Sequence, residues 1–238
     1  MLNAAIIRRL LLLSSAGLLL LNCSGGTTRD VLATVLAVDG TCVAREFGAH
    51  KSDLLAPRAT LPSGAVVSTG PGSRVALALL PNVRIELMEQ SELQIVRLLL
   101  TKDGNETGNA MRDRQVEVRL LRGSAVVSQV LGDGGRSKVY VETPAGTLLG
   151  DYEALLRIEH ADETTRALCV SGIVEFRPRG SQAAIPLPRG SAGEWCRGQS
   201  RIFLAETDAR GQEDLQQALA ADQNLRVLMS RFRYVLPR

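Results

Sequence analysis

Side chains capable of acid–base or metal chemistry are few and scattered in this chain of 238 residues. The two histidines, His50 and His160, stand apart from the cysteines and lack the spacing of metal ligands. The polar run Glu159–Glu163, which contains His160, predicts a solvent-exposed turn. We therefore expect no metal site and no histidine-based catalysis.

Carboxylates offer a second kind of chemistry, because a positioned pair can exchange protons with a substrate. Glu86, Glu89 and Glu92 lie close together, but their spacing on strands favours an exposed acidic face over a catalytic pair. Asp151 and Glu153 share one face of a predicted strand. That pair could help to bind a cation or a partner protein.

Motifs for phosphate binding and nucleophilic catalysis are missing from the sequence. The glycine-rich run 132–135 lacks the lysine-containing ending of a phosphate loop, so a hairpin turn explains it better. No serine stands in the Gly-x-Ser-x-Gly pattern of a nucleophile elbow. The sequence predicts no catalytic residues and no cofactor, and thus a protein that is not an enzyme.

Composition argues against a nucleic-acid partner. The formal net charge is +3, or +1 once the positive charges of Arg8 and Arg9 are removed, which leaves no electrostatic basis for binding phosphate backbones. Aromatic residues make up only 3% of the chain, whereas base- and sugar-binding surfaces rely on aromatic faces. Nucleic acid is therefore excluded as an expected partner, and polysaccharide is disfavoured.

The N-terminus has the pattern of an export signal. Arg8-Arg9 precedes an apolar run, Leu10–Leu21, that is shorter than the roughly 20 residues of a membrane span. The run ends at Leu20-Leu21-Asn22-Cys23, which resembles a bacterial lipobox except that Asn22 stands where Gly, Ala or Ser is usual. An uncleaved N-terminal anchor and ordinary cleavage nearby are the alternatives.

Residues 1–22 are accordingly predicted to be a lipoprotein signal peptide, followed by a tether over residues 23–30. Cys23 would carry the lipid and hold the protein in a bacterial cell envelope. Ser24 stands in place of the Asp that often marks inner-membrane retention, which favours the periplasmic face of the outer membrane.

Alternation of apolar and polar residues predicts many short β-strands across residues 31–205. Val83, Ile85 and Leu87, for example, share one face, with Arg84 and Glu86 on the other. Each such run is bounded by Gly, Pro, Asn, Asp or Ser, so we expect an all-β domain. The polar run 101–115 has no periodicity and is expected to be an exposed loop.

A short unit repeats within this domain. Ser63–Ser68 resembles Gly123–Ser128, Ser171–Phe176 is a looser third copy, and each has a Gly at the start of a short apolar strand. Gly permits a tight corner at such a point. Copies of a corner and a strand favour a β-solenoid-like or twisted β domain, with a sandwich of hairpins as the alternative.

The apolar spacing changes from two to three and four residues near the C-terminus. This spacing predicts one amphipathic α-helix between Thr207 and Arg233, within a C-terminal segment 206–238, with Thr207 or Asp208 as its N-cap. The helix could fold back onto its own domain or bind a partner. Its expected apolar face comprises Leu215, Ala218, Leu219, Ala221, Leu225, Leu228, Met229 and Phe232.

Three cysteines are left once Cys23 is assigned to lipid. They are Cys42, Cys169 and Cys196, of which the last two are closest in sequence and are expected to form a disulfide in an oxidising compartment. The alternative is that all three are small buried apolar residues.

The order of these motifs resembles the FecR-domain family. Leu61–Leu77 resembles the family's glycine-initiated strand, its Thr-Gly turn and the strand that follows. Leu80–Leu87 matches the next element, with Pro81-Asn82 in place of Asp-Gly, whereas Gly150–Ile158 lacks the family's Thr and Phe. Further matching segments are Ser91–Ile95, Leu121–Val127, Val139–Gly146, Cys169–Val174 and Leu187–Gly190.

This resemblance implies a periplasmic, non-enzymatic FecR-like β domain over residues 31–205. The best-known members relay siderophore-receptor signals to a sigma factor through a cytoplasmic anti-sigma segment. Only about nine residues precede the apolar run here, so we expect that segment to be missing.

We therefore expect a non-enzymatic, lipid-anchored FecR-domain protein of the cell envelope that acts as a protein-interaction, sensing or scaffold module. Its partner would be an envelope protein, and its contact surfaces would be the sheet edges, loop 101–115 and the C-terminal helix. The alternative is an envelope lipoprotein that binds a small ligand or polysaccharide, which a deep pocket lined by Arg residues would favour.

Overall fold

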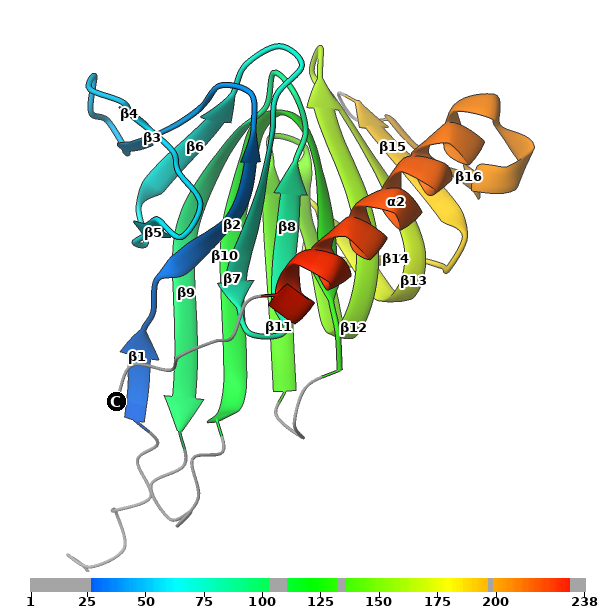
Figure 1. Cartoon of the computed structure of the whole chain (residues 1–238). Helices are drawn as coiled ribbons and strands as arrows, with labels where there is room; N and C mark the ends of the chain where they lie inside the picture. Colours follow the sequence, from blue (N-terminus) through cyan, green and yellow to red (C-terminus); the bar gives the residue numbers. More distant parts are fainter. Residues whose placement is uncertain (1–26, 103–110, 132–135, 197–198, 232–238) are drawn as a thin grey trace, which may run out of the picture.

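The computed structural model describes residues 27–102, 111–131, 136–196 and 199–231. Within these residues it contains sixteen strands, one short 3-10 helix and one long α-helix near the C-terminus (Figure 1). The prediction of an all-β fold of many strands with one C-terminal helix is therefore confirmed.

Three long strands organise the sheet, because each of them runs through two layers. They are β10 (Met111–Gln129), β12 (Gly146–Ala161) and β13 (Thr164–Pro178). The first half of β10 pairs with β9 (Glu92–Lys102), whereas its second half pairs with β8 (Val83–Leu87). The sheet is thereby folded over, and its two layers share one apolar core.

We call the two layers the helix-side layer and the far layer. The helix-side layer contains, in spatial order, β5 (Thr60–Leu61), β2 (Ala33–Asp39), β7 (Arg74–Leu80), β8, the second halves of β10 and β12, the first half of β13, β15 (Ser191–Cys196) and β16 (Gln199–Leu204). The far layer contains, in spatial order, β4 (Asp53–Leu54), β3 (Cys42–Glu46), β6 (Ala65–Thr69), β9, the first half of β10, β11 (Arg136–Thr143), the first half of β12, the second half of β13 and β14 (Ile185–Leu187). In the same layer, β1 (Thr27–Asp30) pairs with the end of β9.

The glycines of the repeated unit are corners of this folded sheet. Gly64, Gly123 and Gly172 have φ angles of +91°, +81° and +92°, a left-handed region that Gly enters at little cost. Gly123 and Gly172 lie where β10 and β13 pass from one layer to the other. Among the described strands, neighbours pair antiparallel except β10 with β11, so the copies are bends in a twisted, folded sheet and not stacked coils.

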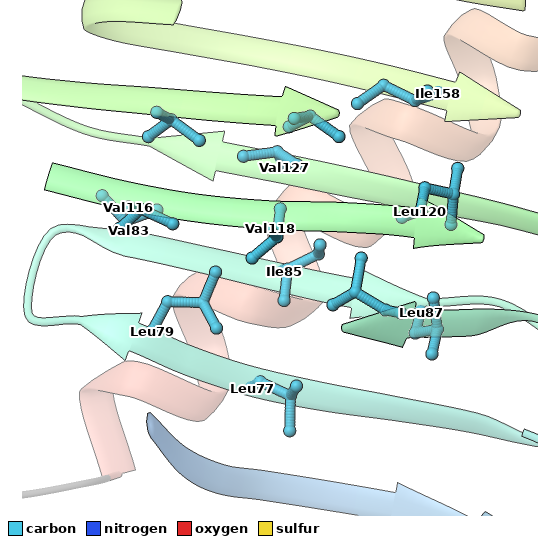
Figure 2. Close-up of a cluster of buried hydrophobic side chains, with 14 of the residues drawn as sticks. Leu77, Leu79, Val83, Ile85, Leu87, Val116, Val118, Leu120, Val127 and Ile158 are labelled. Atoms are coloured by element: carbon cyan, nitrogen blue, oxygen red, sulfur yellow. The ribbon is translucent and has the colours of Figure 1, made fainter. Parts of the chain in front are cut away.

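Strict alternation directs one face of each strand into the core between the layers. Figure 2 shows Val83, Ile85 and Leu87 of β8 gathered beside Val118 and Leu120 of β10, and all five are fully buried. Burying each such side chain contributes about 1.5–3 kcal/mol. The register follows from this pattern, because a slip of one residue would turn the charged face inward.

The 3-10 helix η1 (Ala205–Thr207) leads into α2 (Ala209–Arg231), which crosses the outer surface of the helix-side layer (Figure 1). The helix therefore folds back onto its own domain. Of its predicted apolar face, Leu219 is half exposed and Phe232 lies outside the described residues. The buried apolar contacts join Ala218, Ala221 and Leu225 of α2 to Leu36, Ala76, Ala78, Val126 and Leu155 of the sheet.

Candidate interaction site beneath helix α2

Charged side chains point outward from the helix-side layer, and α2 covers them. Strand alternation places Arg157 of β12, Arg166 of β13 and Glu86 of β8 on the face opposite the core. Their exposed fractions are nevertheless only 8%, 4% and 2%. The contact between α2 and the sheet therefore combines small apolar side chains with buried charges.

Asp214 of α2 joins the two buried arginines. Its Oδ1 lies 2.9 Å from Nη1 of Arg157, and its Oδ2 lies 2.8 Å from Nε of Arg166. Arg166 also contacts Glu194 and donates a hydrogen bond of 2.8 Å to Asp208. Burial alone would lower the pKa of Arg166, but these three carboxylates outweigh it and raise that pKa above its ordinary value.

Asp208 has a second role as the N-cap of α2. Its Oδ2 accepts a hydrogen bond of 3.1 Å from the backbone N–H of Gly211, which satisfies one of the free donors at the helix start. The hydrogen bond from Arg166 holds the pKa of Asp208 below its usual value. Of the two predicted caps the structure uses Asp208, because the Thr207 hydroxyl donates to the Leu204 carbonyl instead.

Buried carboxylates also hold the second half of α2. The Ser128 hydroxyl of β10 donates a hydrogen bond of 2.5 Å to Oδ1 of Asp222, and Arg226 donates to Oδ2 at 2.6 Å. Asn224 donates a hydrogen bond of 3.2 Å to Oε2 of Glu86. Polar contacts thus set the position of the helix along its whole length.

Glu86 is the least compensated charge in this contact. The nearest guanidinium nitrogen for which the structure gives an ion pair, Nη1 of Arg74, is 4.0 Å away, and the Arg74 side chain is 57% exposed. Burial raises the pKa of Glu86, although Asn224 and Arg74 both act in the opposite direction. A buried ionisable group with a shifted pKa beside a cleft marks a candidate functional site.

A cavity of about 790 Å³ opens beside Glu86, between α2 and the helix-side layer. Arg74 and Arg157 line it from the sheet, and Gln217 and Asn224 line it from the helix. Its volume suits a small ligand or a few side chains of a partner protein. We take this groove and the charged contact around it as the candidate site.

The predicted exposed acidic face does not exist as one surface. Glu86 is buried because α2 covers it, which overturns the expectation for that residue. Glu89 is exposed and accepts a hydrogen bond of 2.8 Å from the backbone N–H of Gly72. Glu92 forms an ion pair of 2.7 Å with Arg45. The three carboxylates thus serve three different contacts.

His160 is not in a solvent-exposed turn. It lies within β12, is nearly buried, and its Nδ1 is 3.1 Å from the Thr165 hydroxyl. Asp151 and Glu153 flank Tyr152 at an irregularity in the β12–β13 pairing, where Tyr152 has a φ of +62°. Across the described ranges, no three side chains of His, Cys, Asp or Glu form a group that could hold a metal ion.

The structure contradicts the expected Cys169–Cys196 disulfide, since Cys42, Cys169 and Cys196 are all free thiols. Cys169 lies opposite Ser191 and Cys196 lies opposite Thr164, so five residues of strand separate the two cysteines. At about 3.3 Å per residue this is roughly 16 Å, far beyond the reach of a disulfide. Cys42 and Cys169 are buried, whereas Cys196 is exposed.

Some predicted features lie outside the described residues. They are the lipid-attachment residue Cys23, the glycine-rich run 132–135 and residues 103–110 of the expected loop. The described ends of that range, residues 101–102 and 111–115, belong to strands β9 and β10, so the expectation of a loop is wrong for those residues. No helix in the part of the chain that the structure describes is long and apolar enough to cross a membrane.

Asp214 and Asp222 were not among the predicted contact residues. A signal was present, because positions 214, 218 and 222 recur every four residues and therefore share a helix face with the buried Ala218. Two acidic residues on an apolar helix face require buried partners. The partners that the sheet provides, Arg157, Arg166 and Ser128, lie 48 to 94 residues away in sequence.

Comparison with known proteins gives one family match and two similar structures. Residues 65–175 match the family model described as FecR protein. No curated protein matches the chain. Two crystal structures of a candidate anti-sigma factor from Parabacteroides distasonis ATCC 8503, at 1.65 Å and 2.50 Å, have 16% and 15% sequence identity and TM-scores of 0.41 and 0.40.

Each of these two comparisons covers 58% of this chain and 57% of the other, so the chain spans little more than half the length of these structures. The family match begins at the first residue of β6 and ends within the second half of β13. It therefore includes the glycine corners of β10 and β13 and most of the shared core. The segment that matches the FecR family, residues 65–175, thus forms the centre of the folded sheet.

Proposed function

We propose that this chain is a non-enzymatic FecR-domain protein of the bacterial cell envelope that acts through protein–protein contact. Lipid on Cys23 would hold it at the periplasmic face of the outer membrane, where it serves as a sensing or scaffold module. The FecR match supports the regulatory class, and the similar structures from Parabacteroides distasonis are named for anti-sigma activity.

The observation that carries this proposal is the set of buried ion pairs and hydrogen bonds that hold α2 on the sheet. Buried ion pairs add less net stability than apolar contacts of the same size, but they define one position for the helix. The helix lies beyond the family match, but the sheet face that it covers is formed mostly by residues within the match. Because these polar contacts join α2 to the sheet, a partner protein that binds the exposed surface of α2 can act on the sheet beneath the helix.

Site-specific photocrosslinking in intact cells tests this proposal. A photoreactive residue at Leu219, on the exposed surface of α2, is expected to capture one defined envelope protein. Leu54 of β4, which is more exposed but lies in the far layer, is the matched control. Equal capture from both positions, or none from Leu219, would contradict the proposal.

Fractionation tests the lipid anchor separately. The wild-type chain is expected in the membrane fraction, and the Cys23→Ala variant is expected in the soluble periplasmic fraction because it cannot carry lipid. A Cys23→Ala variant that still sediments with membranes would contradict the proposed lipid anchor at Cys23.

Binding of a small anionic ligand or polysaccharide is the second candidate function, and the groove beneath α2 favours it. Arg74 and Arg157 both line that cavity of about 790 Å³. Saturable binding of an acidic oligosaccharide by the purified chain, weakened in Arg74→Gln, would support this alternative. Arg74 is the useful position because it is half exposed, so its loss leaves the core intact.

A further inference from the structure

A second cavity, of about 510 Å³, lies at one end of the folded sheet. It shares no lining residue with the groove beneath α2. Its walls come from the turn between β11 and β12, the ends of β12 and β13, and Trp195, Cys196, Gln199 and Ser200 of β15 and β16. Residues of both layers therefore meet around it.

Aromatic and proline side chains form the apolar wall of this cavity. The Trp195 ring of β15 stacks on the Phe176 ring of β13, with a centroid separation of 3.8 Å and an interplanar angle of 27°. Pro144 and Pro178 extend the apolar surface on the far-layer side. Such a wall suits a flat or branched apolar group of a ligand.

The indole N–H of Trp195 has no hydrogen-bond acceptor among the described residues, although Trp195 is only 4% exposed. Buried indole N–H groups usually have an acceptor, and an unpaired one destabilises the fold. An acceptor atom that enters the cavity beside Trp195 would remove this cost. Trp195 lines the cavity, so this unpaired donor belongs to the cavity wall, which also includes the carboxylate of Glu163.

Arg179 supplies a second donor at the same cavity. It follows the end of β13, and its backbone N–H donates a hydrogen bond of 2.9 Å to the Ala145 carbonyl, which fixes it beside the β11–β12 turn. Its guanidinium makes no hydrogen bond or ion pair within the described ranges. A free guanidinium is the side chain best suited to bind a carboxylate.

We propose that this cavity binds a small organic carboxylate with a flat or branched apolar body. The body packs against Trp195, Phe176 and the two prolines. The carboxylate accepts hydrogen bonds from Arg179 and from the indole N–H of Trp195. Both a free acid and the C-terminal carboxylate of a short peptide present this chemistry, so the test below includes each.

Trp195 is the only tryptophan of the chain, so intrinsic fluorescence of the full-length protein in mild detergent reports on this cavity alone. Phenylacetate is expected to cause a saturable change in emission, and phenylacetamide, which lacks the charge, is expected to cause none. The tripeptide Gly-Gly-Phe distinguishes a peptide C-terminus from a free acid, because tighter binding of the tripeptide than of phenylacetate would assign the site to peptides.

Two arginine variants complete the test. Arg179→Gln is expected to weaken phenylacetate binding about tenfold or more, because it removes a charge-assisted hydrogen bond. Arg177→Gln is the matched control, since Arg177 is exposed near the end of β13, two residues before Arg179, and does not line the cavity. Equal weakening in both variants, binding of the amide as tight as that of the acid, or no saturable signal with either carboxylate would overturn the proposal.

Cys196 gives an independent readout, because this exposed thiol also lines the cavity. Bound phenylacetate is expected to slow maleimide labelling of Cys196, quantified by mass spectrometry of its peptide. In Trp195→Phe, which retains an aromatic ring but loses the N–H, this protection is expected to require a higher ligand concentration. Unchanged labelling at saturating phenylacetate would contradict the proposed location.

Discussion

Two buried carboxylates on the outer face of the sheet show how the surroundings of a residue decide its role. Asp214 lies within 3 Å of two arginines and is fully compensated. Glu86 has one hydrogen bond from Asn224 and a distant contact with Arg74. Asp214 therefore stabilises the position of α2, whereas an ionised Glu86 is unfavourable when α2 covers it.

Glu86→Gln is expected to stabilise the fold at neutral pH. Burial raises the pKa of Glu86 above its ordinary value of 4.5, so its favourable contribution is complete below that value and is lost as pH rises through the raised pKa. The amide cannot ionise and still accepts the hydrogen bond from Asn224. At pH 7 the gain should be on the order of 1 kcal/mol.

Urea unfolding between pH 4 and pH 8 measures this effect. The stability difference between Glu86→Gln and wild type should be smallest at the acidic end and grow toward neutral pH. Glu89→Gln, at an exposed position, is the control for the general effect of replacing a carboxylate by an amide. A constant difference across this range would show that Glu86 is not the titrating group.

At the scale of elements, charges position the helix and glycines position the strands. α2 is tied to β12 and β13 by Arg157, Arg166 and Asp214. β10 and β13 change layer at Gly123 and Gly172, where positive φ angles allow each strand to bend. The folded sheet and its helical cover therefore depend on a small number of side chains between otherwise regular elements.

Asp214→Asn is expected to release α2 from the sheet. Removing the shared carboxylate leaves two buried arginines partly uncompensated, which typically costs about 3–5 kcal/mol. Arg210→Gln is the matched control, because its ion pair with Glu159 is exposed and should contribute less than about 1 kcal/mol. Hydrogen exchange should show faster exchange across α2 in Asp214→Asn, and equal exchange in the two variants would contradict this role.

A pair of glycine variants tests the layer-crossing corner. Gly64 and Gly172 have nearly the same φ, but an added Cβ meets nothing within 4 Å at Gly64, whereas at Gly172 it would lie 1.9 Å from the Glu153 carbonyl oxygen. Gly64→Ala should cost about 1–2 kcal/mol for the left-handed conformation alone. Gly172→Ala should cost more than about 3 kcal/mol, because the backbone must also move.

Thermal and urea unfolding of both variants provide the comparison. Equal losses of stability would mean that the conformation of the corner, and not the close approach of β12, determines the need for glycine at position 172.

At the scale of the whole molecule, the segment that matches the FecR family is one part of a larger folded sheet. The match ends within β13, yet β15, β16 and α2 continue the helix-side layer and cover its outer face. Both cavities involve these additional elements. The surfaces that we propose for partner and ligand binding are therefore built jointly by the FecR domain and the segment that follows it.

Cysteine reactivity tests the packing of the whole molecule. Burial raises the pKa of the Cys169 thiol to about 11 and also raises that of Cys42, so both should resist alkylation at neutral pH while the fold is intact. Cys196 is exposed and should react. All three should react in denaturant, as measured by mass spectrometry. A Cys169–Cys196 disulfide peptide from oxidised protein would contradict the strand register.

Local patterns in the sequence determined the strand faces, the sheet corners and the C-terminal helix of this protein. Period-two alternation predicted the core face of strands such as Val83, Ile85 and Leu87, because that alternation follows from strand geometry. The glycine repeat predicted corners, since only Gly adopts such φ angles easily. Apolar spacings of three and four residues predicted the helix, with Thr207 or Asp208 as its N-cap. The motif order pointed to the FecR family.

Only the tertiary structure decided which polar faces are buried. Alternation places Glu86 and Arg157 opposite the core, but it cannot tell whether water or a distant helix covers them. The separation of Cys169 from Cys196 and the contact of Trp195 with Phe176 likewise depend on how β13 pairs with β15 and changes layer. These contacts join residues far apart in sequence and form only when the sheet folds. Local sequence patterns therefore cannot predict them.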